Sequence, residues 1–235
     1  LRNNLFDQYQ RWKPRAYAEA PVRIVDIDDE SLARLGQWPW PRTRLAELVD
    51  QLGAAGVAAI GFDVIFAEPD RTSPQASVDL WQLKGSLREA LVALPDHDRV
   101  FAESVARGDV VVGFAVDRSK AAKSAQNAPE LPAKMARFIV AGEPPARWLH
   151  SFNDIIGSLP ELADAAKGNG ALTFVPDGDG VVRRVPLVLQ VAGQPVATLA
   201  GETLRVGQGV PNVILKSAGE GVGLDEIRIG DVTIP

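Results

Sequence analysis

Apolar and polar positions in the first third of the chain follow a pattern that predicts two parallel strands joined by helices. Residues 22–27 are rich in β-branched side chains, which favour strands. Residues 57–66 form a nearly continuous apolar run, which is typical of a parallel strand covered on both faces. Between them, Asp28 should cap a short helix and Thr43 a longer one with an apolar face. Strand, helices and strand in this order predict a right-handed βαβ unit.

The rest of the chain predicts a third parallel strand, an irregular segment and then a C-terminal part with short antiparallel strands. Two helices, over 80–94 and 98–108, should precede a strand over 109–116. Residues 117–150 lack a clear period, so we expect an irregular insertion there. The later expected elements are a helix over 160–166, strands over 170–175 and 181–191, a helix over 195–206, and short strands at 213–215, 226–229 and 232–234. Together they predict one α/β domain over 1–235, with a mixed, largely parallel central sheet flanked by helices and an antiparallel C-terminal part.

Residues 1–14 predict a separate helix with one apolar face. Leu1, Leu5, Tyr9 and Trp12 recur at near-helical spacing, and Pro14 should end the helix. Such a stripe usually packs against a core. It could instead be the face on which two copies of the chain associate, or continue a membrane anchor as a juxtamembrane helix.

Composition and charge narrow the possible functions. The net charge of −5 argues against nucleic acid or an anionic lipid surface, because both call for a basic face. The absence of cysteine excludes disulfides, thiolate metal sites and a cysteine nucleophile. The longest apolar run, residues 52–62, is far short of the ~20 residues that a membrane-spanning helix needs. Because the chain begins at Leu1 with no signal segment, we expect it to be part of a longer protein.

Three aspartates lie where the predicted parallel strands end. Asp26 and Asp28 follow the first strand, and Asp63 lies near the end of the second. Ligands bind at this edge of open α/β sheets, and clustered carboxylates need a cation, an arginine or a raised pKa. Oxygen ligands alone would suit Mg²⁺ or Ca²⁺. In the alternative interpretation, Asp28 is a helix cap and the other two are held by backbone amides or by Arg42.

The loop that contains Trp38, Trp40 and Arg42 also has two interpretations. The indoles could stack on a ligand while the guanidinium pairs with an anion. Alternatively, the two prolines of the loop stiffen it, the tryptophans cover the core, and Arg42 pairs with an aspartate. Both remain open from the sequence.

Two long motifs resemble the type-two CHASE family. They are VDIDDESLARLGQWPWPR at residues 25–42 and GVAAIGFDVIFAEPD at residues 56–70. A later family pattern is matched by Gly170, Phe174, Asp177, Asp179, Gly180, Val182 and Arg183. The resemblance runs from about Asp7 to the end of the chain, except for residues 117–150.

The resemblance implies a non-catalytic, extracytoplasmic sensor domain of a bacterial membrane receptor. Members are attached to histidine kinases, adenylate or guanylate cyclases and Ser/Thr kinases. The implied partners are the receptor's own transmembrane helices, its cytoplasmic output module, a second copy of the receptor in the membrane, and an unknown small ligand or ion. The implied location is periplasmic, and nucleic acid is not an expected partner.

One enzymatic alternative shares a short motif with the chain. Haloacid-dehalogenase-like phosphatases carry Asp-x-Asp after the first strand and use Mg²⁺, and Asp26 and Asp28 have that spacing. The pattern of those enzymes has Thr or Val where this chain has Glu30, and the chain shows no convincing later lysine motif. Residues 177–180 resemble the start of a calcium loop, but the terminal glutamate is replaced by Val188, so we predict a turn.

Overall fold

The computed structural model describes residues 2–16, 18–117, 129–219 and 221–235. Its contacts divide the chain into two compact units, Leu1–Trp40 and Pro41–Pro235, which are described here separately.

The first unit contains two helices and no strand among its described residues. The helices are α1 (Arg2–Trp12) and α2 (Asp29–Leu35). The strand predicted over residues 22–27 is wrong: Val22, Ile24 and Val25 are exposed in irregular backbone. High β-propensity forms a strand only where a neighbouring strand and a packing face are available.

Both helices of the first unit follow the sequence pattern. Asp28 caps α2 by accepting a hydrogen bond of 2.8 Å from the backbone N–H of Ser31. Gly36 ends α2 with a φ of 92°, a conformation that favours glycine. In α1 the side chains of Leu5, Tyr9 and Trp12 are exposed, whereas Leu1 lies outside the described residues.

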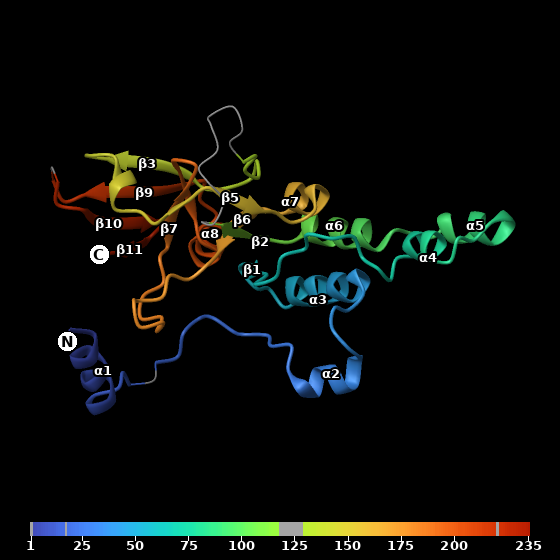
Figure 1. Ribbon diagram of the computed structural model, residues 1–235, viewed down its shortest axis with the longest axis horizontal. Helices are drawn as coiled ribbons and strands as arrows, with labels where there is room; N and C mark the ends of the chain where they lie inside the picture. The colour runs from blue at the N-terminus through green and yellow to red at the C-terminus, as the bar shows by residue number, and fades with distance from the viewer. Residues whose placement is uncertain (1, 17, 118–128, 220) are drawn as a thin grey trace. The chain divides into compact units, whose positions relative to one another are not determined.

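A mixed sheet forms the centre of the second unit (Figure 1). Its longest strand, β2 (Val110–Asp117), pairs in parallel with β1 (Ile60–Gly61) and β6 (Gly168–Leu172), and antiparallel with β5 (Asp154–Ile156). Only two residues of the predicted strand 57–66 are therefore in the sheet. The residues after β1 leave the sheet, and Phe62 and Phe66 pack edge-on with Phe101 at centroid distances of 5.2–5.6 Å.

Helices surround this sheet. They are α3 (Arg42–Ala54), α6 (His97–Arg107), α7 (Pro160–Ala165) and α8 (Leu199–Gly207). Helix α6 packs against α3 and α7, and α8 packs against β6 and β2. Two further helices, α4 (Pro74–Leu80) and α5 (Gly85–Val92), form a hairpin that extends beyond the outer end of α6 (Figure 1).

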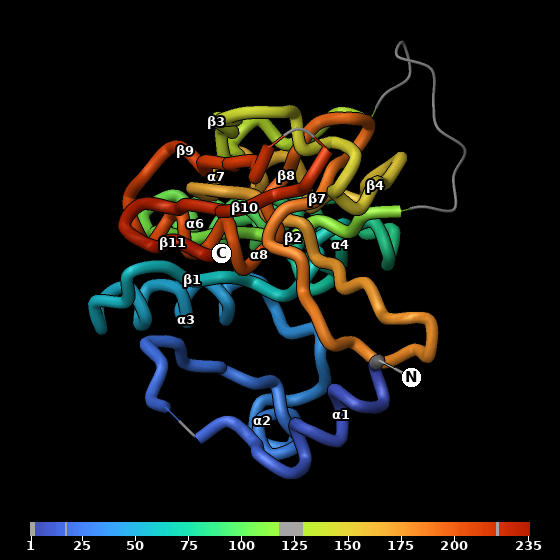
Figure 2. Tube along the Cα trace, turned by 90° about the vertical axis from the view of Figure 1, so that its left-hand side faces the viewer, coloured from blue at the N-terminus to red at the C-terminus, as the bar shows by residue number. Residues whose placement is uncertain are grey.

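Two smaller sheets complete the second unit. In one, β9 (Asn212–Ser217), β10 (Leu224–Ile229) and β11 (Val232–Ile234) form an antiparallel meander, and β3 (Arg137–Ala141) runs parallel beside β9 (Figure 2). The other sheet contains β4 (Ser151–Phe152), β7 (Val188–Val191) and β8 (Gln194–Ala197), and a 3-10 turn at Pro145–Arg147 precedes β4. The α/β class and the antiparallel C-terminal part are confirmed.

Several predicted boundaries need correction. The helix expected over 80–94 is reduced to α5, and α4 ends at Leu80, where the expected helix was to begin. Gln82, between the two helices, has a positive φ of 51°, which a continuous helix does not accommodate. Helix α3 begins at Arg42 after Pro41, so Thr43 is not its cap. The strand expected over 181–191 is reduced to β7, and the segment from residue 195 begins as β8 before α8 starts. Residues 117–150 are not irregular throughout, since they contain β3, while residues 118–128 lie outside the described part.

Candidate functional site

The structure does not form the sheet edge at which Asp26, Asp28 and Asp63 were predicted to meet. Asp26 and Asp28 belong to the first unit and Asp63 to the second, and the strand that was to carry the first two to a sheet edge does not form. All three side chains are exposed. The hydrogen bond from Ser31 lowers the pKa of Asp28 below its ordinary value, as expected for a helix cap. A shared Mg²⁺ or Ca²⁺ ion at these residues therefore has no support from strand pairing.

The two tryptophans of the loop before α3 contact each other. Their rings meet edge to face at a centroid distance of 5.7 Å, and the Trp38–Pro39 peptide bond is cis. Trp40 is buried, and its Nε1–H donates to the carbonyl of Gly36 at 2.6 Å. The indole of Trp40 is thus engaged within its own loop, which supports the packing interpretation. A role for either tryptophan in binding a ligand stays a prediction.

Arg42 is the first residue of α3, and its buried guanidinium is bound on several sides. Its Nε–H donates to Asp98 Oδ1 at 3.2 Å, and Nη2 donates to the carbonyl of Glu68 at 3.3 Å. Its carbon Cζ lies 4.5 Å from the ring centroid of Phe66, a cation–π contact. Its backbone N–H donates to Asp70 Oδ2 at 2.7 Å. The expected arginine–aspartate pair exists, but the aspartate is Asp98 and not Asp26, Asp28 or Asp63.

Asp70 connects this arginine to the start of α6. Its carboxylate accepts hydrogen bonds from the backbone N–H and the hydroxyl of Thr72, both at 2.8 Å, and lies 3.3 Å from Nδ1 of His97. Its own N–H donates to Asp98 Oδ2 at 2.7 Å. Burial acts to raise the pKa of Asp70, but the donors from Arg42 and Thr72 outweigh it and lower that pKa.

The pKa of Asp98 is shifted in the opposite direction to that of Asp70. Its side chain is buried, and burial raises its pKa even though the N–H of Asp70 and the charge of Arg42 act in the opposite direction. Two buried carboxylates thus share one buried arginine, which holds the start of α3, the segment after β1 and the start of α6 together. A charge removed from this cluster would leave another without compensation.

An acidic trio adjoins this cluster at the neighbouring ends of α6 and α7. Asp96, Asp98 and Glu161 each offer one carboxylate oxygen, and these oxygens all lie within 4.8 Å of one another. Asp96 also caps α6 by accepting from the backbone N–H of Arg99 at 3.1 Å. Partial burial and the charges of Asp98 and Asp96 raise the pKa of Glu161. Three carboxylate oxygens in this arrangement could hold a hard cation such as Mg²⁺ or Ca²⁺.

Sequence reasoning missed the acidic trio. The local signal is the pair of aspartates on either side of His97, at the start of a predicted helix, where an aspartate commonly serves as a cap. Glu161 lies far along the chain, and only the packing of α7 on α6 brings it to Asp96 and Asp98.

The late family motif forms an ion-paired turn. Arg183 donates to Asp177 at 2.9 Å and to both oxygens of Asp179 at 2.9 and 2.8 Å. Gly180 closes the predicted turn with a φ of 81°, and its N–H donates to the carbonyl of Asp177. The Arg183 side chain is 5% exposed and the Arg184 side chain 66%, so the two neighbours point in different directions.

The paired arginine strongly affects the acidity of this turn. Its hydrogen bonds, followed by one from the N–H of Val181, lower the pKa of Asp179 from 3.8 to about 2. The carboxylates of the motif are thus satisfied by the arginine of the same motif. This arrangement resembles a structural clasp more than an open binding site.

Comparison with known proteins identifies the family. The sequence model of the CHASE2 domain matches residues 1–233, which is nearly the whole chain. No curated protein and no solved structure matches the chain. Within the part of the chain that the structure describes, no helix has the length and apolar character that crossing a membrane requires. The chain belongs to the CHASE2 family, whose members are extracellular sensory domains of signalling receptors.

Proposed function

We propose that this chain is the non-catalytic input domain of a bacterial transmembrane receptor, on the periplasmic side of the membrane. The observation that carries the proposal is the CHASE2 match over residues 1–233. The cytoplasmic output module would be a histidine kinase, a cyclase or a Ser/Thr kinase, joined to this domain by the receptor's transmembrane helices. A small ligand or ion that favours one arrangement of the domain would shift the population of receptor states and so change the output.

The contacts of the family-motif residues support a framework role for them. Asp28 caps α2, Trp40 donates to its own loop, and Arg42 joins two buried aspartates. Arg183 holds the late turn through Asp179. Motif residues whose side chains are engaged in contacts within the domain stabilise its structure. A catalytic role would require reactive side-chain groups that are accessible to a substrate.

The phosphatase alternative finds little support in the geometry. Its two aspartates must project from the end of a strand into a site, but residues 22–28 form no strand and Asp28 is a helix cap. Asp26 is exposed in irregular backbone. Carboxylates in such a segment are not held in the geometry that nucleophilic attack requires.

A hydrolysis assay distinguishes the two functions. We expect the chain with Mg²⁺ to hydrolyse p-nitrophenyl phosphate no faster than the Asp26→Asn variant. Asp29→Asn is a matched control, because it changes a neighbouring exposed carboxylate outside the Asp-x-Asp pair. Turnover that Asp26→Asn abolishes and Asp29→Asn preserves would overturn the sensor proposal in favour of a phosphatase.

A further inference from the structure

A helical hairpin projects from the second unit, and we call residues 74–94 the arm. It consists of α4, a turn and α5, and it extends away from α6 and the sheets (Figure 1). Among the described elements, the extensive contacts of α4 and α5 are with each other. At its base, Nε2 of Gln75 donates to the carbonyl of Leu94 at 2.8 Å, and Ser73 Oγ accepts from the N–H of His97 at 2.9 Å. The two ends of the arm are thus joined where it leaves the body.

The arm exposes several large apolar side chains. Its large exposed apolar side chains are Leu80 (75%), Trp81 (66%), Leu87 (55%), Leu94 (48%) and Val92 (46%). Helices of seven and eight residues are too short to be stable without packing, and here they pack mainly on each other. Five large apolar side chains exposed on so short an element indicate a place where another surface binds.

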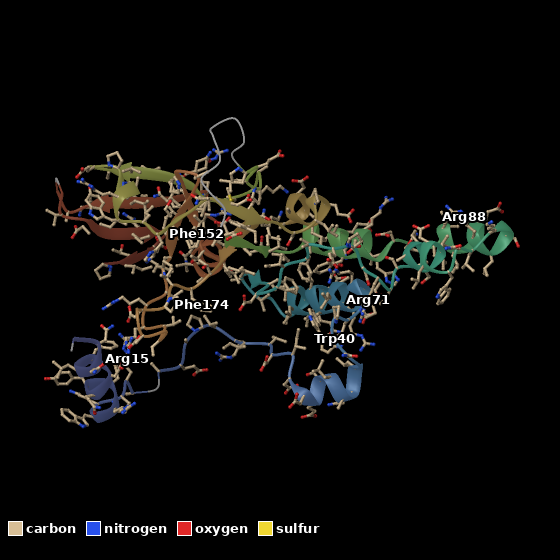
Figure 3. All side chains as sticks on the ribbon, in the orientation of Figure 1. Arg15, Trp40, Arg71, Arg88, Phe152 and Phe174 are labelled. Carbon is tan, nitrogen blue, oxygen red and sulfur yellow. The ribbon has the colours of Figure 1, made fainter. Side chains whose placement is uncertain are left out.

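The charges of the arm indicate what that surface is. Two acids, Asp79 and Glu89, are balanced by two bases, Lys84 and Arg88. Arg88, near the outer end of the arm (Figure 3), lies 3.8 Å from Asp79 at the nearest atoms. Helices that lie on anionic membranes carry an excess of Lys and Arg on the polar face, which the arm lacks. A two-fold contact places the same surface on both sides, so a balanced set of charges can complement itself.

We propose that the arm is the surface through which two copies of this chain associate. The two hairpins would pack their apolar faces together as a four-helix bundle, and acids of one copy would face bases of the other. The inference rests on the proposed receptor function, and it assigns to the arm the pairing of receptor copies that the family resemblance implies. It differs from the earlier expectation that the exposed face of α1 is the dimer contact.

Sedimentation velocity on chain 1–235 tests this assignment. We expect a monomer–dimer equilibrium in which Trp81→Ser raises the dissociation constant about tenfold or more, because tryptophans at the centre of an interface dominate its affinity. Trp12→Ser on α1 is the matched control, since it also removes a largely exposed indole, and it should leave the dissociation constant unchanged. An effect of Trp12→Ser without one of Trp81→Ser would overturn the inference in favour of α1.

Cross-linking provides a second readout that does not depend on a destabilising substitution. The chain has no cysteine, so in a Leu87→Cys variant an oxidant can form a disulfide only between two copies. We expect a cross-linked dimer from Leu87→Cys and none from Phe174→Cys, an exposed position outside the arm.

Two results would contradict the proposal. The first is a chain that stays monomeric up to about 1 mM, the effective concentration that tethering supplies. That result would leave the sensory function itself untouched. The second is Trp81-dependent binding to vesicles of phosphatidylcholine and phosphatidylglycerol without self-association, which would assign the arm to the membrane.

Discussion

Replacing Arg42 with alanine should lower the free energy of unfolding by about 3–5 kcal/mol, because it leaves a buried carboxylate without its cation. Asp98 is buried and would lose the Nε–H donor, and the carbonyl of Glu68 would lose its Nη2 donor. The loss should shrink as the pH falls, since a protonated Asp98 no longer needs a positive partner, and burial already raises its pKa. Urea denaturation monitored by circular dichroism measures the effect.

A control on α6 separates this effect from the general loss of a surface charge. Arg99 pairs with Glu103, and both side chains are largely exposed. Arg99→Ala should therefore change the free energy of unfolding by less than about 1 kcal/mol. Asp98→Asn should reduce the effect of Arg42→Ala, because it removes the buried charge that the arginine compensates. Equal losses in the two arginine variants would contradict the buried cluster.

Replacing Arg205 with methionine should lower the free energy of unfolding by a similar amount, about 3–5 kcal/mol. Glu202 is fully buried and accepts from Nη2 and Nε of Arg205 at 2.7 and 3.0 Å. The arginine also donates to the carbonyls of Val210 and Lys167, so its removal leaves two further, partly buried acceptors without their donor. Burial raises the pKa of Glu202 despite the arginine, so the variant should regain part of its stability as the pH falls.

A neutral partner reveals whether charge causes this loss. In the double variant Glu202→Gln/Arg205→Met the buried group no longer carries a charge, so we expect a smaller loss than in Arg205→Met alone. Arg184→Met, which alters a largely exposed side chain, should have little effect. A double variant as unstable as the sum of the single ones would show that the pair is not coupled.

Helix ends and buried strands could be predicted from the sequence where the determining residues lie within a few positions of one another. Asp28 and Gly36 bound α2 because a cap and a left-handed residue act within one turn of helix. The strand over residues 109–116, which corresponds to β2, could be predicted for the same reason, because a strand buried on both faces is continuously apolar.

The predicted strand at residues 22–27 shows where local reasoning fails. Its β-branched residues fit a strand, but a strand also needs a neighbour, and the sequence does not specify which segment pairs with which. The same holds for β3, whose partner β9 lies far along the chain. Its place in a sheet could not be inferred from residues 137–141 alone.

The expected grouping of Asp26, Asp28 and Asp63 depended on the same strand. A strand over residues 22–27 predicts Asp26 and Asp63 as neighbours at one sheet edge, and without that strand the prediction has no structural basis. The aspartates that bind Arg42 are 28 and 56 residues away. The packing of α3 against α6 brings Asp98 to Arg42, and the path of the chain after β1 brings Asp70 there. Glu202 and Arg205 are near neighbours on α8, but their burial depends on how closely the helix approaches Gly168 in β6.

The proposed function requires that this domain set the activity of an output module across a membrane. The most direct test measures the nucleotide turnover of the output module in the full-length receptor, in membrane vesicles, for the wild type, Arg42→Ala and Arg99→Ala. Because Arg42→Ala loosens the input domain without altering the output module, we expect turnover to change in that variant and to stay at the wild-type level in Arg99→Ala. Turnover that is unchanged in Arg42→Ala, although the domain is shown to be destabilised, would contradict the claim.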